Sequence, residues 1–298
     1  MDRLDAMSTF LAVVEAGSLS AAARRSSTPL ATVSRRISEL ESHLRTKLFN
    51  RSSRKLVLTD AGSSYVAACK RILADVSEAE RIASGEYAAP TGELAVTAPV
   101  GLGRTFLIPI LTDFLKLYPD IKARLILSDR VLSLFQEQID LGLRIGALPD
   151  SSLMAIRVGT TRRVVCASPA YLTERGTPRA PDDLAGHDCI SYTGFVAPDV
   201  WTFVRDSTTV AVPVQPRLVI DSAEAACDAA CAGLGITSAY AYHFQAALDR
   251  GALTTLLDDF QPAALPVNIV YTANRFLPIK VRAFLDFAAP RLKRGFAE

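Results

Sequence analysis

Four arginines and a run of serines and threonines are concentrated in one stretch, GSLSAAARRSSTPLATVSRRISELE, Gly17 to Glu41. Hydroxyl groups, guanidinium groups and the open amides of a helix N-terminus are the groups with which proteins hold phosphates and the edges of bases. A solvated helix face is the alternative, but such a face more typically carries Glu and Lys pairs. The stretch therefore predicts a surface that contacts DNA.

Three helices are predicted to position these side chains. Apolar residues recur at helical spacing from Leu4 to Val14, and Gly17 ends that first helix. Ser18 is a good N-cap for the alanine-rich segment LSAAARR, and Pro29 suits the start of the third helix. The third helix has an apolar stripe that faces the other two, formed by Leu30, Val33, Ile37, Leu40 and Leu44. This order predicts a helix-turn-helix, whose second motif helix enters the major groove.

The face of the third helix opposite that stripe is small, polar and cationic, which suits close approach to a groove. After it, LFNR and KLVL flank a Ser-Ser turn and predict a basic hairpin that serves as a wing, although a solvated turn is the alternative. The residues predicted to contact DNA are Ser18, Ser20, Ser27, Thr28, Pro29, Ala31, Thr32, Ser34, Arg35, Arg36, Ser38, Arg51, Arg54 and Lys55.

The charge distribution agrees with a polyanionic partner for the N-terminus. Residues 1–58 contain 10 Lys and Arg against 5 Asp and Glu, whereas the other 240 residues contain 23 against 26. The net charge of +2 therefore divides into +5 and −3. A chance surface bias would give the same numbers, so charge alone decides nothing.

A long helix is predicted after Thr59, which can cap it. Its apolar residues fall at spacings of 4, 3, 4, 3 and 4, the seam of a two-stranded coiled coil, and predict a dimer. The alternative is a stripe that packs on the chain's own body. The predicted seam consists of Tyr65, Cys69, Ile72, Val76, Ala79 and Ala83. GEYAAPTG then marks a domain boundary.

Short aliphatic strands alternate with helical stretches in the remaining two hundred residues, and the first three strands with the helical stretches between them predict a parallel α/β pattern. Strands are predicted at 93–98, 122–127, 139–145, 154–158, 162–168, 217–221, 235–238 and 267–272. Helices are predicted at 106–117, 131–136, 169–175, 222–233 and 278–289.

The N-terminal segments FLAVVEAGSLSAAARR, ATVSRRISELESHL and KLFNRSSRKLVLTDAG, with the long helix after them, resemble the winged helix-turn-helix of LysR-type transcriptional regulators. The resemblance covers residues 1 to about 90. This chain departs from it at two positions, because the family usually has Gly where Arg45 stands and Leu where Ser26 stands.

The resemblance implies an α/β protein in three parts: a winged helix-turn-helix (1–58), a linker helix that pairs antiparallel with its partner's (59–90), and an effector domain (91–298). The effector domain is similar to type 2 periplasmic-binding-protein-like folds, with one lobe at 91–160 and 266–298 and a second at 161–265. The chain should cross between lobes near Thr160 and Pro266.

Small ligands in such sheets bind outside the carboxyl ends of strands, here in the cleft between lobes. Amides near Thr97 to Gly103 could hold a carboxylate, or these residues simply cap a helix. Arg144 is the predicted cation for an anionic effector, with a structural ion pair between lobes as the alternative, and the aromatic residues from Tyr192 to Trp201 are either wall or core. The predicted effector-binding residues are Thr97, Ala98, Pro99, Val100, Gly101, Leu102, Ser128, Asp129, Arg144, Gly146, Thr193, Gly194, Phe195 and Trp201.

Several classes of protein are disfavoured. No apolar run reaches the ~18 residues of a membrane span, and acids stand where a signal peptide carries cations, so a cytoplasmic protein is expected. The five cysteines form no CxxC pair, so no metal or cofactor is expected, while a redox role for Cys227 and Cys231 stays open. The three histidines are scattered and no HExxH, GxSxG or phosphate-binding GKS/T signature occurs, so an enzyme is not expected.

The sequence thus predicts a transcriptional regulator that responds to a small molecule, with a carboxylate as candidate effector. Its expected partners are double-stranded promoter DNA, a second copy in a homodimer or homotetramer, and RNA polymerase. A solute-binding protein would explain the lobes but not the reading head, and an architectural DNA protein would leave the cleft without a role. The sequence does not define the effector, the target genes, or activation as opposed to repression.

Overall fold

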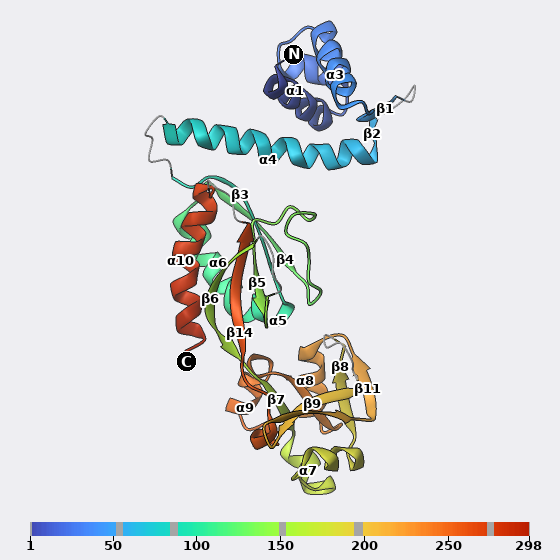
Figure 1. The fold of residues 1–298 in the computed structure, drawn as a ribbon, viewed down its shortest axis with the longest axis vertical. Coiled ribbons are helices and arrows are strands. Elements are labelled where there is room, and N and C mark those ends of the chain that lie inside the picture. Colours follow the sequence, from blue (N-terminus) through green and yellow to red (C-terminus); the bar gives the residue numbers. More distant parts are fainter. Residues whose placement is uncertain are drawn as a thin grey trace. The chain divides into compact units, whose positions relative to one another are not determined.

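The computed structural model describes residues 2–51, 56–83, 89–148, 153–193, 199–272 and 277–297. The chain divides into two compact units, Met1–Ala89 and Pro90–Glu298, each of which has its own core (Figure 1). The structure confirms the predicted order of folds, with a helical N-terminal unit followed by an α/β unit.

The N-terminal unit contains α1 (Arg3–Ala16), α2 (Leu19–Arg25), α3 (Leu30–Leu44), the hairpin strands β1 (Phe49–Arg51) and β2 (Leu56–Leu58), and α4 (Asp60–Ala83). The predicted boundaries follow from local chemistry. Gly17 adopts a left-handed conformation (φ +71°) that ends α1, and Ser18 Oγ accepts a hydrogen bond from the Ala21 amide at the start of α2. Thr59 caps α4 through the Gly62 amide.

The core of this unit joins α1, α2 and α3 to the start of α4. Its buried residues are Ala6, Phe10, Val13, Ala22, Ala23, Val33, Ile37, Leu40, Leu48, Phe49 and Cys69. The predicted stripe on α3 is correct for Val33, Ile37 and Leu40 but wrong for Leu30, which is 49% exposed. Leu44, at the end of the helix, packs against this core, but the core does not extend to Leu30 at the first residue.

The predicted coiled-coil seam is also partly wrong. Cys69 is fully buried in the core just described, and Tyr65 packs on it with its ring 5.5 Å from that of Phe10. These two residues therefore take the alternative role of packing on the chain's own body. Ile72 and Val76 are half-buried, and the side chains of Ala79 and Ala83 lie outside the described part of α4.

The first lobe of the effector unit is a five-stranded sheet in the order β4-β3-β5-β14-β6, covered by α6 and α10 (Figure 1). Its elements are β3 (Gly92–Ala98), α5 (Val100–Leu102), the π-helical turn η1 (Gly103–Leu107), α6 (Ile108–Leu117), β4 (Ile121–Leu127), β5 (Leu141–Ile145), β6 (Leu153–Thr161), β14 (Leu265–Thr272) and α10 (Ile279–Gly295).

The second lobe is a five-stranded sheet in the order β11-β8-β12-β7-β13, with a separate antiparallel hairpin of β9 and β10. Its strands are β7 (Arg163–Ala167), β8 (Cys189–Tyr192), β9 (Val200–Arg205), β10 (Thr208–Pro213), β11 (Pro216–Ile220), β12 (Ile236–Tyr240) and β13 (Thr254–Leu256). Its helices are α7 (Pro169–Arg175), α8 (Ala223–Cys231) and α9 (Gln245–Asp249), with 3₁₀ turns η2 (Pro181–Gly186), η3 (Ala241–His243) and η4 (Asp258–Phe260). The chain enters this lobe between β6 and β7 and leaves it before β14.

The prediction of parallel strands is confirmed for β3, β4 and β5, since β3 runs parallel to both of its neighbours. Each sheet as a whole is mixed, because β14 runs antiparallel to β5 and β6, and β7 runs antiparallel to β12 and β13. One prediction for this unit is wrong. Residues 131–136 form no helix. Val131 is 84% exposed, and Arg144 donates to the Leu132 oxygen, which a helix would have used for the amide of Gln136.

Candidate DNA-binding surface and effector site

The outward face of α3 is open to solvent in the way that a DNA-reading surface requires. Ala31, Arg35 and Ser38 are exposed, while Thr32 and Ser34 are half-buried at its edges. The Arg35 side chain is 72% exposed, and its Nε lies 3.9 Å from Glu39 Oε1, a surface contact that does little to fix it. Arg35 is therefore available to a partner.

Arg36, which was also predicted to contact DNA, is directed into the unit. Its guanidinium donates to Asp5 Oδ2 at 3.2 Å and to Thr9 Oγ1 at 3.3 Å, and it is half-buried. One residue along a helix turns the side chain by about 100°, which is enough to point Arg36 at α1 while Arg35 points outward. The structure thus assigns Arg36 a role in joining α3 to α1.

The other predicted DNA contacts in the helical part lie near the N-termini of α2 and α3. Ser18 caps α2, with its Oγ 3.3 Å from that of Ser20. Ser27 has a left-handed backbone (φ +49°) in the turn, where the Thr28 amide donates to the Ala23 oxygen. Pro29 is exposed.

The predicted wing is present as a short antiparallel pair. β1 and β2 are in register from Phe49 with Leu58 to Arg51 with Leu56. Arg54 and Lys55 lie outside the described residues, as does the Arg51 side chain, so their contacts with DNA remain predictions.

A buried carboxylate fixes the wing to α3. Glu41 accepts hydrogen bonds from the Leu48 and Phe49 amides at 2.9 and 3.3 Å and from Lys47 Nζ at 2.8 Å. Burial alone raises the pKa of Glu41, but these hydrogen bonds and the nearby ammonium outweigh it, so the pKa lies below its ordinary value. Glu41 was not singled out from the sequence, because a Glu in a helix is ordinarily solvated.

In the effector unit, the carboxyl ends of β3 and β4 meet at the start of α5. The Val100 amide donates to Asp129 Oδ1 at 3.0 Å, so the amide that was predicted to hold a carboxylate is already capped by one. This matches the alternative that these residues cap a helix. Gly101 is buried, and a Cβ there would overlap the imidazole of His243 from the second lobe.

Several predicted effector residues on this lobe face inward instead. Ala98 and Leu102 are fully buried in the lobe's apolar core. Thr97 is equally buried, and its hydroxyl donates to the Ile126 oxygen inside the sheet. β3 lies between β4 and β5, and its last five residues are all buried, so consecutive side chains of this strand are covered whichever face they point to.

The remaining predicted residues of the first lobe are more accessible. Ser128 is half-buried, and its Oγ accepts a hydrogen bond from the Arg130 amide. Gly146 directly follows β5 and has a left-handed backbone (φ +97°). Arg144 is half-buried, burial lowers its pKa, and its described hydrogen bonds go to the Leu132 and Leu143 oxygens rather than to an acid of the other lobe.

On the second lobe the predicted wall is only partly described. Thr193 is exposed and its amide donates to the Ile220 oxygen, whereas Gly194 and Phe195 lie outside the described residues. Trp201 is 3% exposed in a core with Phe203 and other apolar residues, so it takes the core role that the sequence left open.

The sequence analysis missed three residues beyond the carboxyl ends of strands in the second lobe, of which Tyr242 and His243 meet the first lobe and Glu224 lies beside His243. Glu224 begins α8 after β11, while Tyr242 and His243 follow β12. His243 Nδ1 lies 3.5 Å from Glu224 Oε1 without the geometry of a hydrogen bond, and Tyr242 packs edge-on against Phe106 of the first lobe at 6.1 Å. The rule that ligands bind beyond carboxyl ends of strands would have found them, had it been applied to both sheets.

These residues form what we call the interlobe cluster: Val100, Gly101 and Asp129 from the first lobe, and Tyr192, Glu224, Tyr242 and His243 from the second. Burial raises the pKa of the Tyr192 hydroxyl, and the Asp129 carboxylate of the first lobe raises it further. Burial lowers the pKa of His243, although the Glu224 and Asp129 carboxylates oppose that shift. The cluster therefore combines a neutral imidazole with two carboxylates at the contact between lobes.

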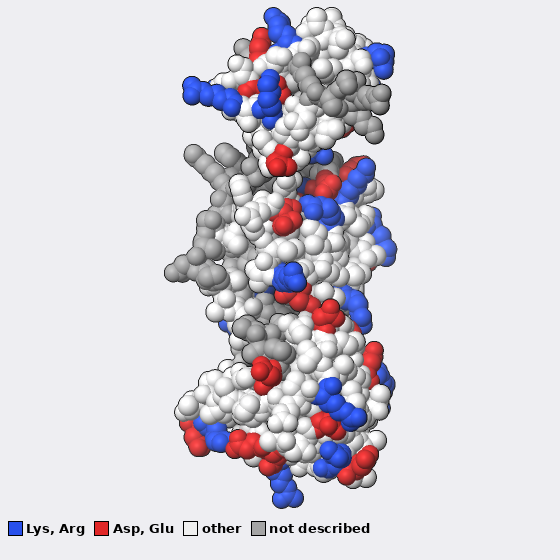
Figure 2. Space-filling view, turned by 90° about the vertical axis from the view of Figure 1, so that its right-hand side faces the viewer, with Lys and Arg blue, Asp and Glu red and all other residues white. Residues whose placement is uncertain are grey.

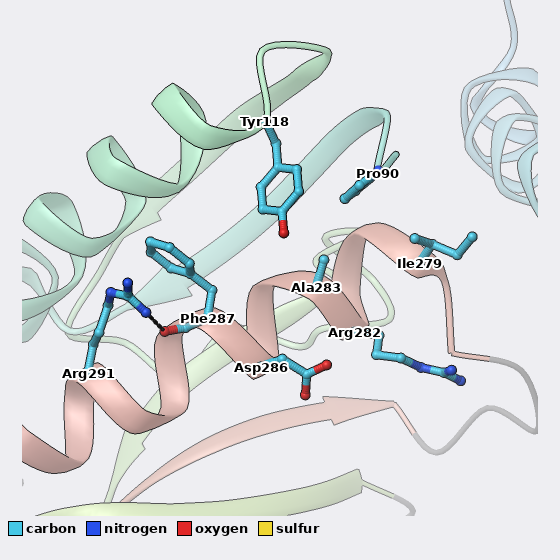
Figure 3. A pocket seen from close by; sticks show the side chains of 8 residues that line it. All are labelled: Pro90, Tyr118, Ile279, Arg282, Ala283, Asp286, Phe287 and Arg291. Atoms are coloured by element: carbon cyan, nitrogen blue, oxygen red, sulfur yellow. Dashed lines mark hydrogen bonds between the residues drawn. The ribbon is translucent and has the colours of Figure 1, made fainter. Parts of the chain in front are cut away.

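A shallow pocket of about 430 Å³ lies elsewhere on the first lobe, at the opposite end of its sheet, beside residues that precede β3 and β4 (Figure 3). It is lined by Pro90, Tyr118, Ile279, Arg282, Ala283, Asp286, Phe287 and Arg291. Figure 3 shows Arg291 donating to the Phe287 oxygen, and its guanidinium carbon is 3.5 Å from that ring's centre. None of the predicted effector residues lines this pocket.

The described part of the chain contains no group of three or more His, Cys, Asp or Glu side chains placed to hold a metal ion. Burial raises the pKa of the Cys166, Cys189 and Cys227 thiols to about 12, so they stay protonated at neutral pH. Among the helices described, none is by itself long and apolar enough to cross a membrane, and only α1 and α2 taken together, bent by 110°, meet the length and composition criteria. On the face of the effector unit shown in Figure 2, acidic and basic side chains are interspersed.

Comparison with known proteins identifies the family. Residues 4–63 match the bacterial regulatory helix-turn-helix protein of the lysR family, and residues 88–293 match the LysR substrate binding domain. The chain belongs to the LysR family. It is a DNA-binding transcriptional regulator of the LysR type, whose activity is modulated by a small molecule that its C-terminal domain binds.

Relatives of this LysR-type regulator match it along nearly its whole length. An HTH-type transcriptional repressor of Pseudomonas aeruginosa is 35% identical over 289 residues, which cover 96% of this chain and 91% of the relative. An uncharacterised HTH-type transcriptional regulator of Haemophilus influenzae is 34% identical, covering 94% and 98%. Among solved structures, CrgA of Neisseria meningitidis is 30% identical with a TM-score of 0.63, covering 97% and 98%. The virulence activator AphB of Vibrio cholerae is 29% identical with a TM-score of 0.61, covering 96% and 98%.

Proposed function

We propose that the outward face of α3 reads the operator in the major groove and that the interlobe cluster is where an effector acts. The observation that carries the first part is the exposure of Arg35 on a face whose other members are small or hydroxylated. The second part is supported by the contact of Gly101 with His243, which brings the two lobes together beyond the carboxyl ends of their strands. An effector there would change the setting of the lobes and, through oligomer contacts, the spacing of the reading heads.

The candidate carboxylate effector fits the cluster poorly. It would meet the Asp129 and Glu224 carboxylates, and the Val100 amide is already capped. We propose that a carboxylate effector would depend on Arg144, whose burial favours pairing with an anion.

We further propose a dimer through the part of α4 that follows Cys69, starting with Ile72 and Val76, and a tetramer built from two such dimers. RNA polymerase is the proposed partner for activation. Because promoter DNA lies in the cytoplasm of the bacteria that hold the relatives, we place the regulator there, and we propose no enzymatic activity.

The test is a selection of binding sites from random duplexes with full-length protein at fixed salt. We expect an interrupted two-fold motif bound at least ~1,000-fold better than scrambled DNA. Arg35→Ala should cost about 1–3 kcal/mol and relax the preference at one position in each half-site. Arg217→Ala, which removes an exposed arginine from the second lobe, is the matched control and should bind like the unmodified protein. An unchanged preference in Arg35→Ala would refute the reading role, and a single unrepeated half-site would refute the dimer.

A further inference from the structure

The first turn of α3 carries an exposed apolar edge. Pro29, Leu30 and Ala31 follow one another and are all exposed, and Leu30 leaves 49% of its surface accessible to solvent. They stand where a groove-binding helix first meets the bases, because the N-terminal residues of such a helix reach the base edges. The surface beside them, with Ser34 and Arg35, is polar and cationic.

Leu30 contributes nothing to the core of its unit. Helical spacing puts it on the same stripe as Val33 and Ile37, which are 1% and 2% exposed. Yet Leu30 is absent both from the buried core and from the half-buried residues packed against it, which include Leu19, Leu44 and Leu56. The turn from Ser26 to Thr28 separates α2 from α3, so the described part of the unit leaves Leu30 uncovered.

An isobutyl group has one specific partner on the major-groove edge of DNA. The bases present hydrogen-bond donors and acceptors there, and the single apolar feature is the 5-methyl group of thymine. Leu30 can neither donate nor accept a hydrogen bond, so it distinguishes bases only through that methyl group. Neighbouring Ala31 is small enough to let the backbone come close.

We propose that Leu30 is a specificity residue that contacts the 5-methyl group of a thymine in each half-site of the operator. This inference rests on the proposed function, in which α3 lies in the major groove. It adds an apolar contact that the polar and cationic side chains of α3 do not make. It also identifies thymine as the base that the first turn of α3 prefers.

Deoxyuridine substitution tests the contact, because it removes the methyl group and leaves all hydrogen-bonding atoms in place. Each thymine of the selected operator is replaced in turn, and the Kd of full-length protein is measured at fixed salt. Burying one methyl group favours binding by roughly 0.8 kcal/mol, so we expect about a fourfold loss at one thymine in each half-site. In the Leu30→Ala variant that particular loss should disappear, while losses at other thymines stay the same.

The matched control is Leu117→Ala, which shortens a 57% exposed leucine in the effector unit and should retain the full deoxyuridine penalty. Because Leu30 is exposed and outside the core, Leu30→Ala should keep the thermal unfolding midpoint of the unmodified protein. Tight binding of every deoxyuridine operator by the unmodified protein would overturn the inference and leave the proposed function intact, as would a Leu30→Ala variant that keeps the penalty. Failure to select any specific operator would overturn both.

Discussion

The two units place their functional groups in opposite ways. In the N-terminal unit one helix of 15 residues, α3, supplies the outward face, and neighbouring positions on it are fixed by the helix itself. In the effector unit the interlobe cluster joins Gly101 to His243, residues more than 140 positions apart, through strands of two different sheets. The outward face of α3 depends only on local helix geometry, whereas the interlobe cluster depends on how the two lobes pack against each other.

The same contrast holds for buried polar groups. The Glu41 carboxylate has a lysine and two amides as partners, so its position is determined. His243 Nδ1 is buried 3.5 Å from a carboxylate without a formed hydrogen bond, and its neighbour Gly101 leaves it no spare room. A hydrogen-bond network in which every polar group has a partner stabilises one arrangement. Where a buried polar group between two lobes lacks a hydrogen bond, a second arrangement of the lobes loses little free energy. This contrast supports the proposal that an effector acts at the contact between the lobes, while the Glu41 network holds the N-terminal unit in one arrangement.

The largest effect is expected from removing the carboxylate of the rigid unit. Glu41→Ala leaves the Leu48 and Phe49 amides buried without an acceptor, which should lower the free energy of unfolding of that unit by about 3 kcal/mol. Urea unfolding, monitored through the hydrogen exchange of residues 30–49, measures this loss of unfolding free energy. Glu39→Ala, which removes an exposed acid two residues away, is the matched control and should change stability by less than about 0.5 kcal/mol.

The pH dependence sharpens this prediction. Since the folded-state pKa of Glu41 is lowered, its contribution is present above the unfolded pKa and is lost as the pH falls through the folded value. The stability difference between the unmodified protein and Glu41→Ala should therefore narrow below about pH 4. A difference that stays constant through that range would mean that the lost packing, and not the carboxylate, is responsible.

Gly101→Ala tests the adaptable unit. The added Cβ would overlap the His243 ring and come within 2.9 Å of Tyr242 Cε2, so either those rings or the lobes must move. We expect a loss of about 1–3 kcal/mol of unfolding free energy, the usual cost of overpacking, together with an altered response of DNA binding to the effector. Thermal unfolding and operator affinity with and without effector measure the two parts.

Gly186→Ala provides the control for Gly101→Ala, because a Cβ at Gly186 meets nothing within 4 Å. It should leave both stability and response unchanged. If Gly101→Ala destabilises the protein while its effector response equals that of the unmodified protein, the contact between lobes is structural and the interlobe cluster is not where an effector acts.

Sequence reasoning was most successful where function is local. The 3.6-residue period of α3, the Ser18 cap and the left-handed Gly17 are properties of neighbouring residues, and the structure has each of them. It did not anticipate that Leu30 is exposed or that Arg36 pairs with Asp5, because where a core ends and which side chain reaches α1 depend on the packing of separate helices.

In the effector unit, the alternation of elements predicted an α/β fold, but strand direction and site residues did not follow from it. The direction of β14 is set by the return of the chain from the second lobe, which no local pattern records. His243 was one of three scattered histidines, since nothing near it in sequence indicates that Gly101 packs against it. The missing information was long-range in each case.

The smallest predicted effect concerns a strained position in the rigid unit. Arg45 ends α3 with a left-handed backbone (φ +52°, ψ +31°), while the Thr46 amide closes the turn onto the Glu41 oxygen. Glycine is the residue that adopts this conformation without strain, so Arg45→Gly should raise the free energy of unfolding by about 0.5–1 kcal/mol even after the added freedom of the unfolded chain is counted. Arg45→Ala retains the strain and controls for loss of the side chain, so its urea midpoint should equal that of the unmodified protein. If Arg45→Gly lowered the urea midpoint instead, the Arg45 side chain would be stabilising the turn. The contrast between the two units would then rest on the Glu41 network and the contact between the lobes alone.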